Sequence, residues 1–220
     1  MTISENLKFV QSQLPASVKL VAVSKTKSAD QIMEAYHAGQ RLFGENKVQE
    51  LMGKWQSLPK DIEWHFIGHL QSNKVKQVVP LVSLIHGVDS YKLLSAINHE
   101  AVKCDRVAAV LLEFHIAGEE SKFGLTLAEA EEILALPDTQ AMKNIAIRGV
   151  MGMATFTRDE ALIKKEFEQL AAIYASLKEK YFSTSPQFCE LSMGMSDDFP
   201  MAVEAGSTIV RIGSRIFGTR

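Results

Sequence analysis

Eight short apolar runs with strand character alternate with helical segments along this chain, and this alternation restricts the fold more than any other feature. The runs occupy residues 18–25, 41–46, 63–68, 84–89, 107–116, 146–154, 188–194 and 208–217. Between them lie amphipathic segments such as 29–39, where Gly39 can end a helix, and 159–182, which starts with Asp159 and has lysines near its end. Strands that alternate with helices predict a parallel sheet covered by helices.

The number and character of the strands favour a closed barrel over an open sheet. The run 107–116 begins VAAVLL, without polar alternation, which indicates a strand buried on both faces. Eight such units within 220 residues fit a compact (β/α)₈ barrel. An open doubly wound sheet usually has fewer strands and a glycine-rich turn after the first, whereas SKTKS contains no glycine. We therefore predict an α/β protein with a single (β/α)₈ (TIM) barrel domain over residues 1–220, its first 15 residues forming a helix over the barrel bottom.

Composition excludes several other classes of protein. The 24 Lys and Arg against 26 Asp and Glu give a net charge of −2, so no basic field indicates a nucleic-acid partner. Two cysteines cannot form a disulfide framework and favour a reducing compartment. The N-terminus lacks a signal-peptide pattern, and no run approaches the roughly 18 apolar residues of a membrane helix. We expect a cytoplasmic monomer without a membrane partner.

Lys25 is the most informative residue at the predicted barrel mouth. Active sites of such barrels lie at the C-terminal ends of the strands, and Lys25 closes the apolar run LVAVSK. We expect its stem to be buried and its amine to point to the mouth, where desolvation lowers the pKa of a lysine and makes the amine a nucleophile for Schiff-base chemistry. On position alone, a lysine that reaches solvent from a strand end is the more common case.

The loops after the last two strands have the composition of a phosphate site. They read SMGMSDD and RIGSRIFG, and barrels often bind phosphate at these two places. Gly194 and Gly213 allow the backbone to approach a ligand, Ser196 can cap the helix that follows, and Ser192 and Ser214 offer hydroxyl groups. One such loop would be better explained by ordinary loop and capping roles. Two such loops, after the two expected strands, make phosphate binding at least as good an explanation.

A Schiff-base lysine and a phosphate cradle in one barrel mouth predict pyridoxal 5′-phosphate (PLP) as the cofactor. A class I aldolase that acts on a phosphorylated sugar would use the same two elements. The pair alone leaves both classes open. Aldolases usually carry their lysine on a middle strand, however, and here it ends the first.

The sequence resembles the pyridoxal phosphate homeostasis protein family over essentially its whole length. The most specific match is WHFIGHLQSNKVKQV (64–78), and AVSKTK, FGENKVQE, GVMGMAT, LSMGMSDD and VRIGSRIFG match in order. The resemblance implies a barrel like the N-terminal domain of alanine racemase, with Lys25 forming the Schiff base to PLP. It places Arg211 opposite the pyridine nitrogen and Asn46 near the ring. The phosphate contacts that it implies are Ser192, Ser196, Gly213 and Ser214.

Other residues in these motifs have less specific interpretations. His65 lies on the third strand run, and we interpret it as a core histidine with its hydrogen bonds satisfied. His65 and His69 are four residues apart on a strand and its exit loop, which disfavours a metal site. Lys74 and Lys76 are expected to face solvent on a helix, with a transient second PLP contact as the alternative.

The same resemblance bears on whether the chain is an enzyme. A racemase needs two bases, and in the racemases with this fold the second is a tyrosine from a C-terminal β domain, which we do not expect in a sequence that ends at Arg220. Tyr91, at the start of the helix after the fourth strand, is the remaining candidate. We therefore favour a non-catalytic protein of intracellular PLP homeostasis that sequesters PLP and delivers it to apo-enzymes. A racemase of the alanine racemase type and a class I aldolase are the alternatives.

Overall fold

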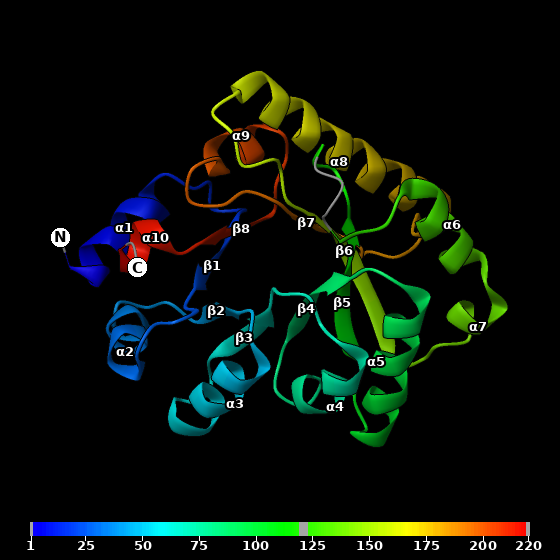
Figure 1. Cartoon of the computed structure of the whole chain (residues 1–220), viewed down its shortest axis with the longest axis horizontal. Coiled ribbons are helices and arrows are strands. Elements are labelled where there is room, and N and C mark those ends of the chain that lie inside the picture. Colours follow the sequence, from blue (N-terminus) through cyan, green and yellow to red (C-terminus); the bar gives the residue numbers. More distant parts are fainter. Residues whose placement is uncertain (1, 119–122, 219–220) are drawn as a thin grey trace.

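A computed structural model describes residues 2–118 and 123–218 and shows eight parallel strands closed into a barrel (Figure 1). The strands pair in chain order, and β8 pairs with β1 to close the ring. They are β1 (Lys19–Val23), β2 (Leu42–Glu45), β3 (Glu63–Phe66), β4 (Leu84–Val88), β5 (Ala108–Phe114), β6 (Ile145–Gly152), β7 (Glu190–Ser192) and β8 (Ile209–Ile212). The predicted (β/α)₈ barrel is confirmed, and each strand lies within or overlaps its predicted run.

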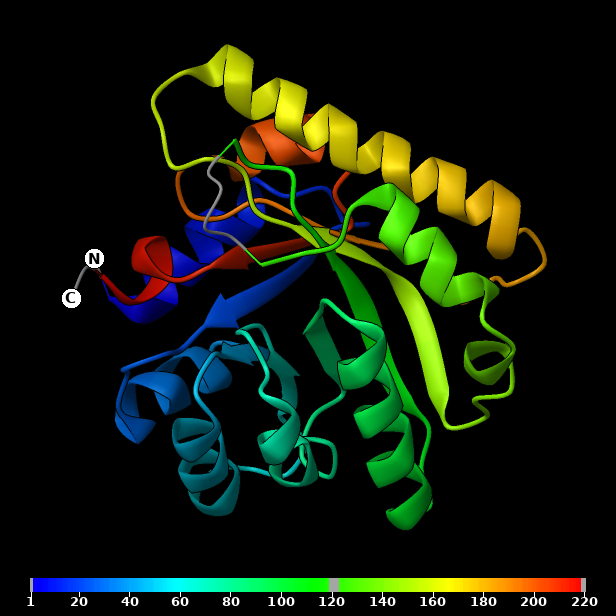
Figure 2. The same ribbon diagram turned by 45° about the vertical axis from the view of Figure 1, so that its right-hand side comes forward.

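Helices surround the barrel on its outer side (Figure 2). They are α1 (Ile3–Ser12), α2 (Ala29–His37), α3 (Val48–Ser57), α4 (Val75–Val78), α5 (Tyr91–Lys103), α6 (Leu127–Ala135), α7 (Pro137–Gln140), α8 (Glu160–Tyr181), α9 (Phe199–Glu204) and α10 (Ser214–Phe217), with a 3₁₀ turn η1 (Ser72–Lys74) before α4. Asp159 caps α8 as predicted, because its side chain accepts hydrogen bonds from the N–H groups of Ala161 and Leu162. No described helix is both long and apolar enough to cross a membrane.

Two elements differ from the prediction. The run 208–217 is a strand only as far as Ile212, and its end forms α10, because Ile216 and Phe217 pack into the core beside α1. Helix α1 does not cover the barrel bottom. It packs against α2 and α10 on the outer side, where the Asn6 side chain donates a hydrogen bond to the Ile216 carbonyl at 3.1 Å. Leu7, buried on the inner face of α1, joins the main core.

The hydrophobic core has two parts, as a closed barrel requires. The larger part lies between the strands and the helices. The smaller part lies inside the barrel and contains Val21, Leu84, Leu111, Met151 and Ile209. Polar side chains occupy the rest of the interior, and they lead up to the C-terminal ends of the strands.

Candidate functional site

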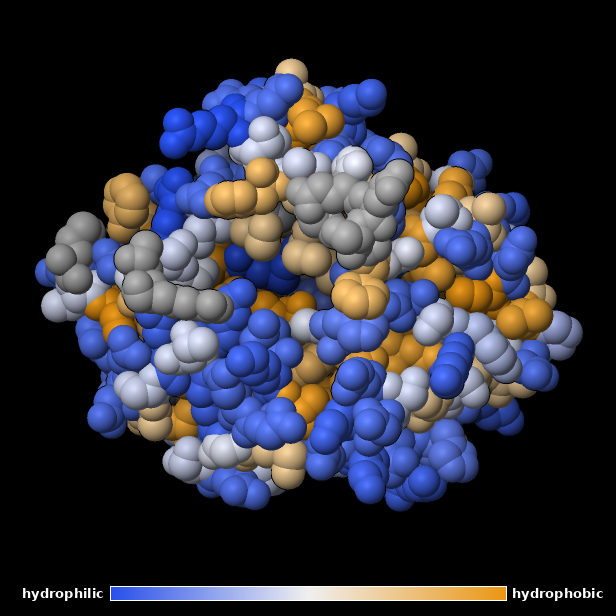
Figure 3. Space-filling view, viewed as in Figure 1, coloured by the Kyte–Doolittle hydropathy of each residue, from blue (hydrophilic) through white to orange (hydrophobic). Residues whose placement is uncertain are grey.

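A cavity of about 760 Å³ opens at the C-terminal ends of the strands, and it brings together most of the predicted site. Figure 3 shows a hollow in a mostly hydrophilic face of the molecule. Six of the eight predicted residues line the cavity, namely Lys25, Asn46, Ser196, Arg211, Gly213 and Ser214. The other two, Ser192 and Gly194, do not line it. The cavity volume lies within the range of small-molecule and cofactor sites.

Two of the described lysines line this cavity, and their contacts distinguish them. The Lys27 ammonium donates to the carbonyl groups of Phe217 at 3.2 Å and Gly218 at 3.1 Å, at the end of α10. The Lys25 side chain is half-buried, and its amine makes no hydrogen bond or ion pair to any residue that the structure describes. Lys25 therefore presents a free amine to the cavity, as a nucleophile requires.

The loops after β7 and β8 meet on one wall of the cavity. The Gly213 N–H donates to Ser196 Oγ at 3.3 Å and joins the two loops. Ser214 begins α10, where the first N–H groups have no acceptor within the helix. We expected Ser196 to cap α9, but it does not. Asp198 occupies the position before that helix, and its carboxylate accepts the Met195 N–H at 2.5 Å. Ser196 Oγ accepts from Gly213 and keeps its own proton, so the wall offers an anion this hydroxyl group and the N–H groups at the start of α10.

Ser192 and Gly194 support the cavity from behind. Ser192 is fully buried, and its hydroxyl group accepts a hydrogen bond from Arg211 Nη1 at 2.6 Å. Gly194 has φ +94°, and a Cβ there would lie 2.6 Å from the Cβ of Ala202 in α9. Only glycine allows this turn and this packing together. The Ser192 hydroxyl group contacts Arg211, and its phosphate contact stays a prediction.

Asn46 gives the cavity a polar group without a partner. It follows β2, and its side-chain Oδ1 atom is buried with no hydrogen-bond partner among the described residues. A buried acceptor of this kind is costly unless a ligand or water satisfies it. Together with the free amine of Lys25 and the donor-rich wall, it shows that the residues present fit a ligand with an aldehyde, polar ring substituents and a phosphate.

A chain of hydrogen bonds leads from Arg211 down the barrel interior. Arg211 can only donate, so Ser192 Oγ accepts from it and has its own proton for His86 Nδ1, 3.0 Å away. His86 Nε2 in turn lies 2.9 Å from His65 Nδ1. Burial lowers the pKa of His65 to about 3 and the pKa of His86 well below its ordinary value, so both imidazoles are neutral. His65 is the satisfied core histidine that the sequence indicated.

The sequence analysis missed Glu113, which lines the cavity, and His86, which contacts Ser192 behind it. Glu113 lies near the end of β5 and lines the cavity. Burial, and then the charge of Asp89, raise its pKa to about 7, while the charge of Arg211 acts in the opposite direction. A glutamate in an otherwise apolar strand was the available signal, since such a residue is rarely buried without a role. The cavity therefore contains a carboxyl group that titrates near neutral pH.

Several residues considered from the sequence lie away from the cavity. Lys76 is exposed on α4 and Lys74 half-buried on η1, and neither lines it. The Tyr91 hydroxyl group lies 3.4 Å from Asp138, outside the cavity. None of the tyrosines, all of which are described, lines the cavity wall. Within residues 2–118 and 123–218, no three His, Cys, Asp or Glu side chains gather as a metal site would require.

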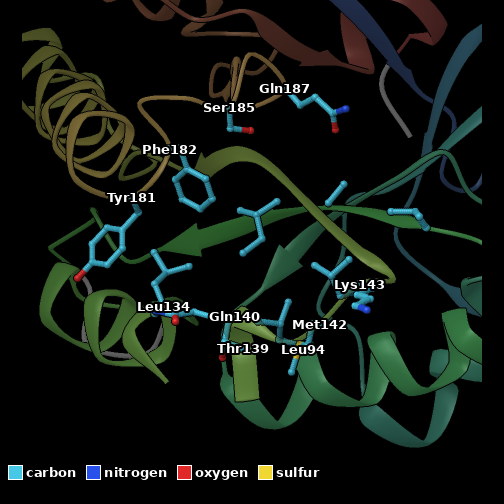
Figure 4. A pocket seen from close by; sticks show the side chains of 14 residues that line it. Leu94, Leu134, Thr139, Gln140, Met142, Lys143, Tyr181, Phe182, Ser185 and Gln187 are labelled. Atoms are coloured by element: carbon cyan, nitrogen blue, oxygen red, sulfur yellow. The ribbon is translucent and has the colours of Figure 1, made fainter. Parts of the chain in front are cut away.

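A second cavity, of about 590 Å³, lies on the outer side of the barrel between β6, α5, the α6–α7 connection and the end of α8 (Figure 4). Its lining is largely apolar, with Leu134, Met142 and Phe182 among the residues that face it. None of the predicted site residues reaches it. The chemistry of the chain is concentrated in the larger cavity.

Comparison with known proteins identifies the family of the chain. The family model described as alanine racemase, N-terminal domain, matches residues 1–220. The pyridoxal phosphate homeostasis protein of Vibrio alginolyticus is 38% identical over 234 aligned positions, which cover 100% of this chain and 98% of the relative. The protein of the same name from Escherichia coli K12 is 39% identical and covers 94% of this chain and 87% of its own length.

Solved structures give the same relationship. PipY from Synechococcus elongatus PCC7942, with PLP bound, matches with a TM-score of 0.89 and 38% identity over 99% of this chain and 100% of that one. Alanine racemase from E. faecalis has a TM-score of 0.76 at 14% identity, which shows the shared fold alone, and the match covers 58% of that chain. With the fold, the sequence identity over the full length and the family model in agreement, this chain belongs to the pyridoxal phosphate homeostasis protein family, whose barrel is that of the alanine racemase N-terminal domain.

Proposed function

We propose that this chain holds PLP as a Schiff base on Lys25 and acts in PLP homeostasis without catalytic turnover. The observation that carries the proposal is the free amine of Lys25 in a cavity of about 760 Å³ that is also lined by Arg211, Ser196 and Gly213. The Lys25 nitrogen attacks the aldehyde carbon, a C=N bond forms, and the aldehyde oxygen leaves as water. Full-length relatives named for PLP homeostasis, and a PLP-bound relative, support the choice of ligand.

The other residues of the cavity hold the rest of the molecule. Ser196, Gly213 and Ser214 would bind the phosphate through backbone and hydroxyl donors. Asn46, with its buried Oδ1, would contact the polar edge of the ring. Arg211 would face the pyridine nitrogen, and its two terminal nitrogens are already fixed by bonds to Ser192 and to the Gly152 carbonyl.

Arg211 is the main reason to propose a carrier. When PLP is bound to an enzyme, a protonated ring nitrogen lets it withdraw electrons from a substrate carbon. A guanidinium has no acceptor for such a proton and carries a positive charge, so it disfavours the protonated ring. Arg211 is buried, and three hydrogen bonds to Ser192 and Gly152 fix its guanidinium group in place. The chain is built to keep the reactive aldehyde and not to use it.

The absence of a tyrosine from the described lining of the cavity supports the same conclusion. Racemisation needs a proton donor on each face of the substrate carbon, and no tyrosine lines the part of the cavity that the structure describes. We propose that the chain acts as a monomer that sequesters PLP and passes it to PLP-dependent apo-enzymes. An incoming amine can displace Lys25 by exchange at the same carbon, so release needs no additional catalyst.

The test is spectroscopic and chemical. Wild-type protein mixed with PLP should develop the yellow absorption of a Schiff base, and borohydride reduction with peptide mapping should place the adduct on Lys25 and not on Lys27. Lys25→Ala should retain its circular dichroism spectrum and lose the adduct. Lys103→Ala, an exposed lysine of α5 outside the cavity, is the matched control and should behave as wild type.

Each alternative function has its own outcome. A reducible adduct that persists in Lys25→Ala would refute the assignment of the lysine. Interconversion of L- and D-alanine by the PLP-loaded protein, lost in Lys25→Ala, would favour the racemase. A protein that takes up no PLP but is trapped by borohydride with a phosphorylated sugar would be an aldolase of class I.

A further inference from the structure

A cluster of three charged side chains lies on the outer side of the barrel, directly behind the loop that carries Lys25. Glu45 ends β2, and Glu50 and Lys54 lie one turn apart on α3. The motif FGENKVQE contains both glutamates, yet only its Asn46 belongs to the cavity. The role of this charged cluster is not explained by the binding of a ligand.

The cluster holds the residue before Lys25 by two different groups. The Ser24 hydroxyl group donates to Glu45 Oε1 at 2.5 Å. The Lys54 ammonium donates to the Ser24 carbonyl at 2.8 Å and to the same Glu45 oxygen at 2.7 Å. Ser24 and Glu45 are fully buried, so these bonds are shielded from water.

The residue after Lys25 is held by the same cluster. Thr26 has φ +66°, a left-handed conformation that a side chain other than glycine rarely adopts. Its N–H donates to Glu50 Oε2 at 2.7 Å, and that oxygen lies 3.4 Å from the Lys54 ammonium. The contact to Thr26 is the main cause of the lowered pKa of Glu50, which keeps the carboxylate ionised as an acceptor.

The placement of these charges is not explained by stability alone. The Lys54 side chain is 12% exposed, and the second oxygen of Glu45 is buried without a partner among the described residues. A buried ion pair of this kind contributes little to stability compared with an apolar pair, because both charges lose their water. Here the charged groups bind the backbone on both sides of Lys25, and the backbone on one of these sides, at Thr26, is strained.

We propose that Glu45, Glu50 and Lys54 are positioning residues that fix the backbone at Ser24 and Thr26, and thereby aim the Lys25 amine into the cavity. This inference rests on the proposed role of Lys25. Without the cluster, Thr26 relaxes towards negative φ and the loop moves. The Lys25 amine then no longer points into the cavity, where it would react with an aldehyde.

The first measurement uses the protein without PLP and follows hydrogen exchange at the Thr26 amide. In Glu50→Ala the amide loses its acceptor, and its exchange should rise about tenfold or more. Glu50→Gln retains an acceptor oxygen and should keep most of the protection. Glu131→Ala, which removes the distant ion pair with Lys180 at 3.0 Å, is the matched control and should leave Thr26 unchanged.

The second measurement follows Schiff-base formation with PLP by absorption in the same variants. Glu50→Ala and Lys54→Met should form the adduct about tenfold more slowly, or bind PLP about tenfold more weakly, with Glu50→Gln between them and wild type. Folded variants with wild-type exchange at Thr26 and wild-type adduct formation would overturn the proposal. If Lys54→Met does not fold, the partly exposed Glu50 still decides the question. If wild type forms no adduct on Lys25, the proposed function fails, and the exchange at Thr26 still reports on the cluster by itself.

Discussion

The buried carboxyl group of Glu113 predicts a stability that depends on pH in an unusual direction. Most carboxyl groups in folded proteins become more acidic, but burial beside Asp89 raises the pKa of Glu113 to about 7 from an ordinary value of 4.5. The unfolded chain ionises this group near pH 4.5, whereas the folded chain keeps it protonated until about pH 7. Stability is therefore complete below pH 4.5 and is lost as the pH rises towards and through 7.

The magnitude follows from the size of the shift. A difference of about 2.5 pKa units, at 1.36 kcal/mol per unit, corresponds to about 3 kcal/mol of unfolding free energy. Glu113→Gln removes the titrating proton and keeps the shape of the side chain. The unfolding free energy of the variant relative to wild type should rise by roughly 2 to 3 kcal/mol from pH 5 to pH 8.

Urea denaturation of the PLP-free protein at pH 5 and pH 8 measures this difference directly. Glu132→Gln, an exposed glutamate of α6, is the control and should give the same difference from wild type at both values. A gap between Glu113→Gln and wild type that stays constant from pH 5 to pH 8, or that shrinks, would refute the buried and protonated state of Glu113.

Two further predictions concern the support of the cavity. Gly194→Ala should lower the unfolding free energy by about 2 kcal/mol or more, because φ is +94° and the new Cβ would meet Ala202 at 2.6 Å; a urea midpoint within error of wild type would contradict this. Since burial lowers the pKa of His65 to about 3, the unfolded chain takes up the proton first, and stability is lost as the pH falls below about 6.5. Between pH 6.5 and pH 5, the unfolding free energy of wild type should fall by about 1.5 kcal/mol more than that of His65→Gln. Parallel profiles by urea denaturation would show that His65 is not buried as a neutral group.

The fold was predictable because local apolar runs indicate both the number of strands and their burial on two faces. The helical conformation at the end of the run 208–217 was not predictable. Ile216 and Phe217 are as apolar as strand residues, and only the packing of this segment against α1 favours a helix. The single-domain organisation over residues 1–220 stays a prediction.

The sequence predicted which end of the barrel holds the site, but not which of the inward-facing residues line the cavity. Alternation along β7 and β8 places Ser192 and Arg211 inside the barrel, but the stagger of neighbouring strands decides which of the two reaches the cavity. His86 and Glu113 were missed because they lie in runs recognised for their apolar neighbours. The pairing of His86 with His65 joins two strands and has no signature in either one.

The pairing of β1 with β8 has a consequence for folding. It joins Lys19–Val23 to Ile209–Ile212, and α1 packs against α10 beside it, so the contacts that close the ring have the largest sequence separations in the chain. Such contacts form late, since the entropy of closing the long loop must be overcome first. Lys25 and Ser214 follow these two strands, and a molecule held by both bridges the last seam to close. A ligand bound to both residues would therefore connect the two ends of the barrel and, because only the folded chain could hold it, would raise the unfolding free energy.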